Sequence, residues 1–153
     1  MTIVHAAISA PDTTRPEIFL RTDRFTLAKR LWRGTAADGT EFGFELEAPL
    51  KPGETFFESH TGRYVVVQGE EAVVEISLNI APSAAAGIGW AIGNLHLELS
   101  ADATRLLAPD EPAVRQLLER LKVPYQLTTA VFRPGRFVRG AQPTQELGPS
   151  HKH

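Results

Sequence analysis

The order of apolar segments in the second half of the chain constrains the fold most. Strand-like and helix-like patterns follow one another as β-α-β-β-α-β over about 60 residues, which is the ferredoxin-like split motif. The predicted elements are a strand at Ala72–Leu78, a helix at Pro82–Gly93, strands at Leu95–Leu99 and Thr104–Leu107, a helix at Glu111–Lys122 and a strand at Tyr125–Phe132.

Both predicted helices carry boundary signals. Pro82 is tolerated in a first helical turn, and Gly93 suits a helix end. Gly87 and Gly89 each cost the first helix about 1 kcal/mol relative to alanine, but their small size suits close helix packing. Asp110 is predicted to be the N-cap of the second helix. One face of that helix is expected to be buried, formed by Val114, Leu117, Leu118 and Leu121.

The first half of the chain has the alternation and turn residues of a small all-β domain. Asp38-Gly39 is a strong hairpin signal, and Thr40–Glu47 then alternates apolar and polar residues as a half-buried strand does. Phe25–Arg33 also has apolar and basic residues at roughly strand spacing. The aromatic residues are expected to form the core, or in a second reading to line an apolar groove for a partner peptide. They are Trp32, Phe42, Phe44, Phe56 and Phe57.

These patterns predict an α+β protein in which a small N-terminal all-β domain precedes a ferredoxin-like β-α-β-β-α-β domain. The β-rich domain is expected at 1–70 and the ferredoxin-like domain at 71–136. The remainder, 137–153, ends in Ser-His-Lys-His and is expected to be a flexible tail.

Composition argues against several classes of protein. The 153 residues carry a net charge of -2, which disfavours nucleic acid or an anionic membrane as the main partner. No apolar run approaches the roughly 18 residues of a membrane span, and the N-terminus lacks the pattern of a signal peptide, so the cytoplasm is the expected location. The absence of cysteine excludes zinc–thiolate sites and thiol nucleophiles. With no nucleophile–base motif, phosphate-binding loop or zinc-protease helix, an enzyme is not expected.

Imidazole is therefore the expected ligand if the chain binds a transition metal. Of the five histidines, His96 lies in an ordered-looking segment, where it is expected to head a strand and face away from Leu95 and Leu97. The plainer interpretation is a partly exposed or hydrogen-bonded strand histidine. His151 and His153 form a His-x-His pair, a common recruiter of nickel, copper or zinc, with a solvated chain end as the alternative.

Four sequence motifs resemble those of the UreE family of urease accessory proteins. Residues 37–43 read Ala-Asp-Gly-Thr-Glu-Phe-Gly, similar to the family's Asp-Gly-Thr-Glu-x-Gly, and residues 50–54 read Leu-Lys-Pro-Gly-Glu, similar to its next turn. Residues 90–96 read Trp-Ala-Ile-Gly-Asn-Leu-His after an alanine-rich helix, similar to the family's Tyr-His-Leu-Gly-Asn-Arg-His. Residues 131–134, Val-Phe-Arg-Pro, partly match Pro-Phe-x-Pro. The resemblance extends from about residue 23 to 136.

The resemblance implies a homodimeric nickel metallochaperone that delivers nickel during urease maturation, with urease apoprotein and other urease accessory proteins as partners. By position, His96 would lie at the dimer contact and bind one nickel ion together with its counterpart. His151 and His153 would be a short version of the family's histidine-containing tail. Metal binding and dimerisation would then belong to 71–136, and partner binding to 1–70.

Three features depart from the family pattern. Ala91 stands where the family often has a further histidine, and the start of the second helix, Pro109–Pro112, has no histidine either. The family's long histidine-rich tail is also missing. The alternative function is therefore a protein- or peptide-interaction module with a degenerate metal site. Zinc and copper are the alternative ions, because both also accept imidazole ligands.

Overall fold

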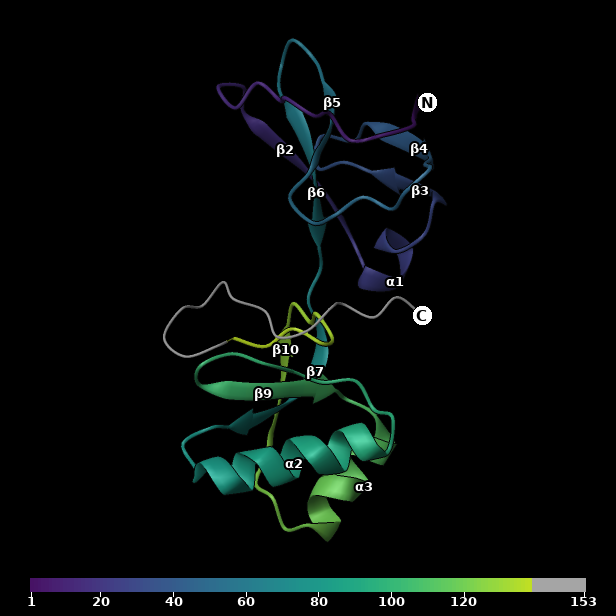
Figure 1. Cartoon of the computed structure of the whole chain (residues 1–153). Coiled ribbons are helices and arrows are strands. Elements are labelled where there is room, and N and C mark those ends of the chain that lie inside the picture. The colour runs from purple at the N-terminus through teal and green to yellow at the C-terminus, as the bar shows by residue number, and fades with distance from the viewer. Residues whose placement is uncertain (139–153) are drawn as a thin grey trace. The chain divides into compact units, whose positions relative to one another are not determined.

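The computed structural model describes residues 1–138 and divides the chain into two compact units (Figure 1). The first unit is Met1–Gly69, and the second begins at Glu70. His151 and His153 lie outside the described residues. In the described part of the chain, no helix is both long enough and apolar enough to cross a membrane.

The N-terminal unit contains two three-stranded sheets. Its elements are β1 (Thr2–Val4), β2 (Glu17–Thr22), α1 (Arg24–Leu27), β3 (Leu31–Thr35), β4 (Glu41–Glu45), β5 (Thr55–Glu58) and β6 (Arg63–Gln68). One sheet has the order β1-β4-β3 and the other β2-β6-β5. Each sheet contains one parallel pair, β1 with β4 and β2 with β6, and one antiparallel pair.

The two sheets share an aromatic core. Phe42 and Phe44 on β4 are buried, as the alternation in the sequence predicts. The Phe42 ring meets Phe56 edge-on with the ring centroids 5.0 Å apart, and Trp32 stacks on Phe44 at 4.0 Å. Phe57 packs partly buried against the same cluster. The predicted aromatic core is therefore confirmed, and these rings do not line an apolar groove.

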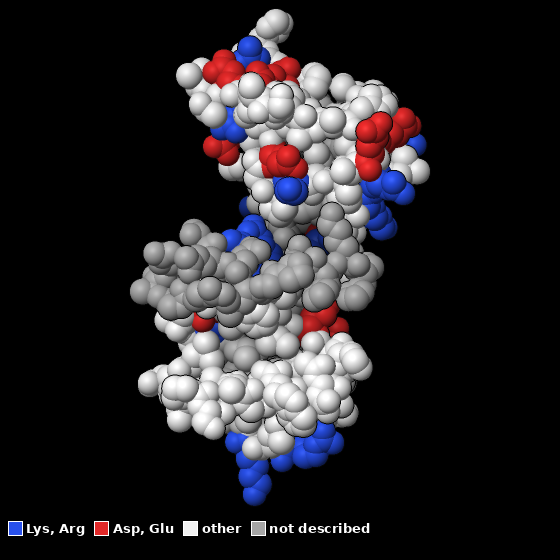
Figure 2. Space-filling model, in the orientation of Figure 1, with Lys and Arg blue, Asp and Glu red and all other residues white. Residues whose placement is uncertain are grey.

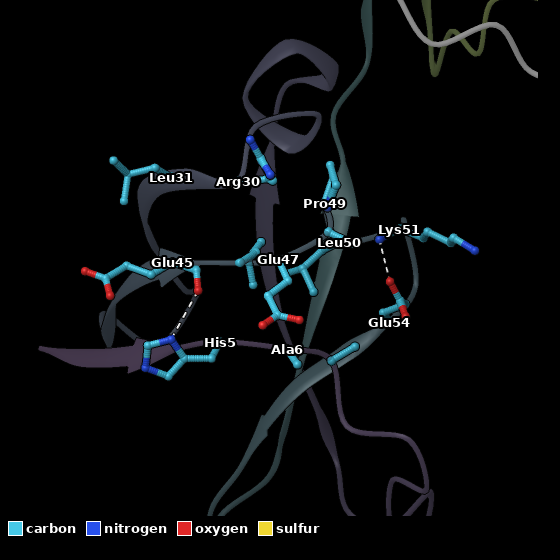
Figure 3. Close-up of a pocket in the computed structure, with 13 residues that line it drawn as sticks. His5, Ala6, Arg30, Leu31, Glu45, Glu47, Pro49, Leu50, Lys51 and Glu54 are labelled. Carbon is cyan, nitrogen blue, oxygen red and sulfur yellow. Dashed lines mark hydrogen bonds between the residues drawn. The ribbon is translucent and has the colours of Figure 1, made fainter.

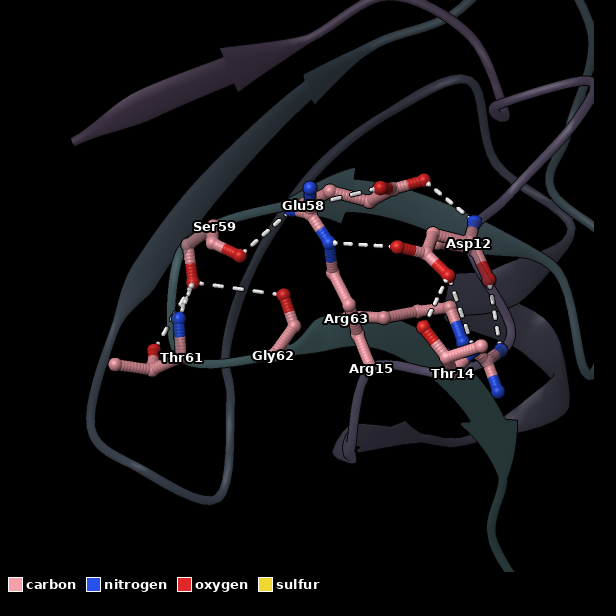
Figure 4. A network of polar contacts seen from close by, with 9 residues as sticks. Asp12, Thr14, Arg15, Glu58, Ser59, Thr61, Gly62 and Arg63 are labelled. Carbon is pink, nitrogen blue, oxygen red and sulfur yellow. Dashed lines mark hydrogen bonds and ion pairs between the residues drawn. The ribbon is translucent and has the colours of Figure 1, made fainter.

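Polar contacts fix the loops of this unit. The Tyr64 hydroxyl donates to Asp38 at 2.6 Å, and the Thr40 backbone N–H donates to the same carboxylate at 3.0 Å. Because both bonds favour the ionised form, they hold the pKa of Asp38 below its usual value. A second network fastens the segment after β1, where Arg15 donates to the Ser59 carbonyl at 2.7 Å and pairs with Asp12 at 3.3 Å (Figure 4).

The N-terminal unit is not entirely β structure. The segment Phe25–Arg33, predicted to be strand-like, starts as the helical turn α1. The Asp23 carboxylate accepts a hydrogen bond from the Thr26 backbone N–H at 2.8 Å and so caps this turn. The chain becomes extended only at Leu31, where β3 begins.

The C-terminal unit has one four-stranded sheet and two helices. Its elements are β7 (Glu71–Ser77), α2 (Pro82–Asn94), β8 (Ser100–Ala101), β9 (Arg105–Pro109), α3 (Pro112–Arg120) and β10 (Gln126–Ala130). The strand order is β10-β7-β9-β8, and all neighbours are antiparallel. Both helices pack on the same sheet face, because one buried cluster joins Ile88 and Ile92 of α2, Val114 and Leu118 of α3, and Val74 of β7.

Three sequence predictions in this unit are wrong. Leu121, expected on the buried face of α3, is 45% exposed, because it is the C-cap at the end of the helix. The strand expected at Leu95–Leu99 is absent, and β8 contains only Ser100–Ala101. The predicted N-cap Asp110 is also not the cap: Glu111 occupies that position without a side-chain hydrogen bond. Asp110 instead pairs with Arg115, with 3.0 Å between its Oδ1 and the arginine Nε.

Candidate metal centre

His96 lies in the turn that ends α2, not at the head of a strand. Its backbone N–H donates to the Gly93 carbonyl at 2.9 Å, and the Leu97 N–H donates to the Ile92 carbonyl at 3.2 Å. This bond pair is the Schellman helix ending, in which the residue after the C-cap is left-handed. His96 occupies that position with φ 58°. The predicted strand fails because the helix terminates in this compact turn.

A tertiary contact holds the turn in place. Ile92 is fully buried, and Leu97 packs partly buried against the same cluster under the helices. An apolar contact between these two positions often accompanies a Schellman ending. The spacing of Ile92 and Leu97 around Gly93-Asn94 is the signal in the sequence that would have placed His96 in a helix-ending turn.

The left-handed conformation has an energetic cost. Glycine usually occupies this position, and other L-residues pay about 1–2 kcal/mol there. Histidine is among the residues enriched in this region, but the conformation is still uncommon. Within the described residues, His96 and Lys122 are the non-glycine residues with positive φ. A strained backbone of this kind motivates a functional hypothesis for the residue that adopts it.

The surface before His96 in the sequence is exposed and uncharged, and the exposed Glu98 follows two residues after it. The His96 side chain is exposed, and so are Trp90 (71%) on α2 and Leu95 (46%) beside it. From Ile76 to Leu97 the sequence contains no lysine, arginine, aspartate or glutamate. The site therefore combines one imidazole with a neighbouring apolar surface.

Beside Trp90, the outer face of α2 carries small residues that the rest of residues 1–138 does not use for packing. A Cβ atom added at Gly87, Gly89 or Gly93 would have no heavy atom within 4 Å. Ala86 is exposed as well, and only Ile88 and Ile92 of this helix are buried. Among residues 1–138, the close packing that the glycines were predicted to serve therefore does not occur.

Within residues 1–138, one chain does not supply a complete ligand set around His96. In that part of the structure, no group of three or more histidine, aspartate or glutamate side chains could hold a metal ion. Ala91, which replaces the family's further histidine, packs partly buried against the helix-side core, so it faces away from the exposed surface. His5 and His60 both belong to the N-terminal unit.

The opposite face of the C-terminal sheet carries a different set of charges. Arg105 pairs with Glu75 at 2.8 Å and with Asp102 at 3.3 Å. Burial tends to raise the pKa of Asp102, but hydrogen bonds from Thr104 and Arg105 outweigh it and hold this pKa below its usual value. These groups satisfy one another, and none of them is a histidine, so they do not form a nickel site.

An open pocket lies in the N-terminal unit (Figure 3). It has a volume of about 1050 Å³ and a base that includes the buried residues Leu46 and Leu50. The His5 Nδ1 lies 3.1 Å from the Glu45 carbonyl at one end, and Glu54 accepts from the Lys51 backbone N–H at 2.6 Å at the other. The residues that line it carry charges of both signs. They do not include the aromatic residues for which a groove was considered, Trp32, Phe42, Phe44, Phe56 and Phe57.

Comparison with known proteins gives two concordant matches. The family model described as the C-terminal domain of the UreE urease accessory protein matches residues 71–153. A protein named urease accessory protein UreE, from Bifidobacterium longum subsp. infantis, is 31% identical over 91 residues, which is 59% of this chain and 41% of the relative. The match thus spans about two fifths of the relative's length. Because the family model covers more than half of the chain and includes the α2 turn, this chain belongs to the UreE family of urease accessory proteins.

Proposed function

We propose that this chain is a nickel metallochaperone of the UreE type that works as a homodimer in the cytoplasm. Its C-terminal unit, a ferredoxin-like domain at 71–136, binds the metal and forms the dimer. Nickel is the cargo and is held between the His96 imidazoles of two copies. The recipient is urease apoprotein, together with other urease accessory proteins.

The observation that carries this proposal is the exposed imidazole at the end of an uncharged helix. One imidazole is too small a ligand set to hold nickel tightly, but a two-fold contact places the same residue of each copy opposite its counterpart. His96 is exposed beside Trp90 and Leu95, so the apolar surface that a partner would cover adjoins the ligand.

The glycines of α2 support dimerisation through this face. Gly87, Gly89 and Gly93 weaken a helix by about 1 kcal/mol each. In the part of the chain that the structure describes, they make no close contact that requires the absence of a Cβ. A second helix laid on this face could approach closely, and the lack of charges lets the surface meet an identical copy without repulsion.

Nickel delivery follows from the small number of protein ligands. Two neutral imidazoles and water molecules leave coordination positions that a recipient's ligands can enter, so the ion can be exchanged. His151 and His153 are proposed as additional ligands that raise the affinity without defining the site. Both lie outside the described residues.

The second candidate function is a protein- or peptide-interaction module with a degenerate metal site. The open pocket of the N-terminal unit and the loss of a histidine at Ala91 favour it. Under this alternative, the 1–70 domain binds its partner whether or not metal is present.

Calorimetric titration of the full chain with nickel, combined with light scattering, tests the main proposal. We expect a dimer that binds one tight nickel ion per two chains. Zinc and copper titrated in parallel identify the preferred ion. A monomer that binds nickel with undiminished affinity, or one tight ion per chain, would contradict paired His96 ligation. Partner binding without any stoichiometric metal would favour the interaction module.

A further inference from the structure

A second exposed surface, on the N-terminal unit, combines cations with apolar side chains. Lys29, Arg30 and Arg33 are all exposed on the segment that leads from α1 into β3. Between them and beside them lie Leu31, 73% exposed, and Phe25, 62% exposed. These five residues form what we term the basic patch. Residues 24–34 contain four basic side chains and no acidic one.

The cations of the basic patch are not neutralised within the described chain. The ion pairs of the N-terminal unit join Arg15 to Asp12 and Glu58, and Arg63 to Glu17. Across residues 1–138, neither Lys29, Arg30 nor Arg33 has a carboxylate within ion-pair distance. These three cations lie within five residues, so together they present positive charge over a short length of the surface.

Acidic residues on the neighbouring strand give the patch a boundary. On the β3–β4 ladder, Glu45 lies opposite Leu31 and Glu41 lies opposite Thr35. Figure 2 shows basic and acidic side chains gathered in separate, adjacent groups where Figure 1 places β3 and β4. A ligand on the patch must therefore carry negative charge over a short length and must not extend that charge over β4.

We infer that the basic patch docks a short acidic segment of a partner protein that also contains apolar side chains. Carboxylates would meet the three cations, and an apolar side chain would cover Leu31. Room for it exists because Arg30 and Leu31 also line the open pocket, whose base includes Leu46 and Leu50. This inference does not depend on His96 or on nickel.

Two other occupants fit less well. A second copy is disfavoured, because a two-fold contact through the patch would set like charges against each other. A nucleic acid is disfavoured because its regularly spaced phosphates would run onto Glu41 and Glu45.

Fluorescence anisotropy with the full chain tests the inference. The probe is a labelled dodecapeptide in which pairs of glutamate alternate with single leucines. The variant Arg30→Glu/Arg33→Glu should weaken its binding by about tenfold or more, because two attractive contacts become repulsive. The matched control is Arg120→Glu/Lys122→Glu, which makes the same change of charge at exposed positions of the C-terminal unit and should leave binding within about twofold.

Two further peptides separate charge from apolar contact. Replacing each glutamate by glutamine should abolish binding, and replacing each leucine by serine should remove the sensitivity to Leu31→Ser. Circular dichroism checks that the variants remain folded. If Arg30→Glu/Arg33→Glu and the control lose peptide binding equally, net charge alone explains the loss and the inference is overturned. Tighter binding of a single-stranded DNA of the same length, lost in the same variant, would replace the protein partner by nucleic acid.

Discussion

The two helices of the C-terminal unit end in the same backbone motif but present different surfaces. At the end of α2, the His96 and Leu97 N–H groups bond back to the Gly93 and Ile92 carbonyls. At the end of α3, Lys122 donates to Glu119 at 3.1 Å and Val123 donates to Leu118 at 2.9 Å, in the same pattern. His96 and Lys122 both have φ 58°.

What differs is the surface around each turn. The end of α3 is charged: Arg120 and Glu119 are exposed, and the Tyr125 hydroxyl donates to Glu119 at 2.8 Å, which raises the pKa of Tyr125. Helix α2 has no charged residue and exposes Trp90, and a Cβ added at its glycines would meet no atom of the described residues within 4 Å. The left-handed turn is thus a common way to end a helix, and the candidate site depends on the imidazole and the uncharged face.

The largest expected effect is on nickel affinity. Losing a side chain that only orients a metal ligand costs about 10–100-fold in metal affinity. His96→Ala should lower nickel affinity by more than this, because it removes both protein ligands of the dimer together. Lys122→Ala, made at the equivalent position of α3, should leave the affinity unchanged. Calorimetric titration measures both. If the two variants bind nickel equally well, the comparison of the turns does not locate the metal.

The next effect concerns the dimer. Gly87→Glu adds a helix-favouring side chain that has free space within the chain. In a dimer through α2 it would bring two like charges together, so we expect the dimer to weaken by about tenfold or more. Gln116→Glu adds the same charge at an exposed position of α3 and should leave the dimer intact. Sedimentation over a range of concentrations distinguishes them, and an unaffected Gly87→Glu dimer would move the contact to another surface.

A smaller effect is expected from the end of the chain. Ending the chain at Gly148 removes His151 and His153 and should lower nickel affinity by about one order of magnitude, without changing dimerisation. Recruiting the two imidazoles costs chain-ordering entropy, which offsets part of each new metal–nitrogen bond. Complete loss of binding in the titration would make the tail, and not the α2 turn, the primary site.

The sequence predicted the parts of the fold that depend on local alternation. Phe42 and Phe44 are buried as their spacing predicts, and Val114 and Leu118 form the inner face of α3. The position of His96 was missed because Leu95–Leu99 alternates as a strand would. In the helix ending that the chain adopts, Ile92 and Leu97 both pack into the core on the helix side of the sheet. That packing outweighs the local alternation.

The prediction that Asp110 is the N-cap of α3 is wrong for a related reason. Its residue type and place before Pro112 fit an N-cap, but its carboxylate instead lies 3.0 Å from the guanidinium of Arg115, one turn further along the helix. A charged partner within reach competes with the helix N–H groups for the same oxygen. Which of them prevails depends on side-chain geometry, which residue spacing alone does not determine.

The smallest expected effect is on stability, and it tests whether the two turns are equivalent. His96→Gly and Lys122→Gly should each relieve the left-handed strain, worth about 1–2 kcal/mol. The greater freedom of glycine in the unfolded chain offsets about 0.5–1 kcal/mol of that, which leaves a gain between about 0 and 1.5 kcal/mol. Urea unfolding in the presence of a chelator measures it, and His96→Ala, which keeps the strained backbone, should show no gain. If Lys122→Gly stabilises the chain and His96→Gly does not, the His96 side chain makes a stabilising contact that the Lys122 side chain lacks. A dimer contact would then be the first place to look, because in the described part of the single chain this side chain is exposed.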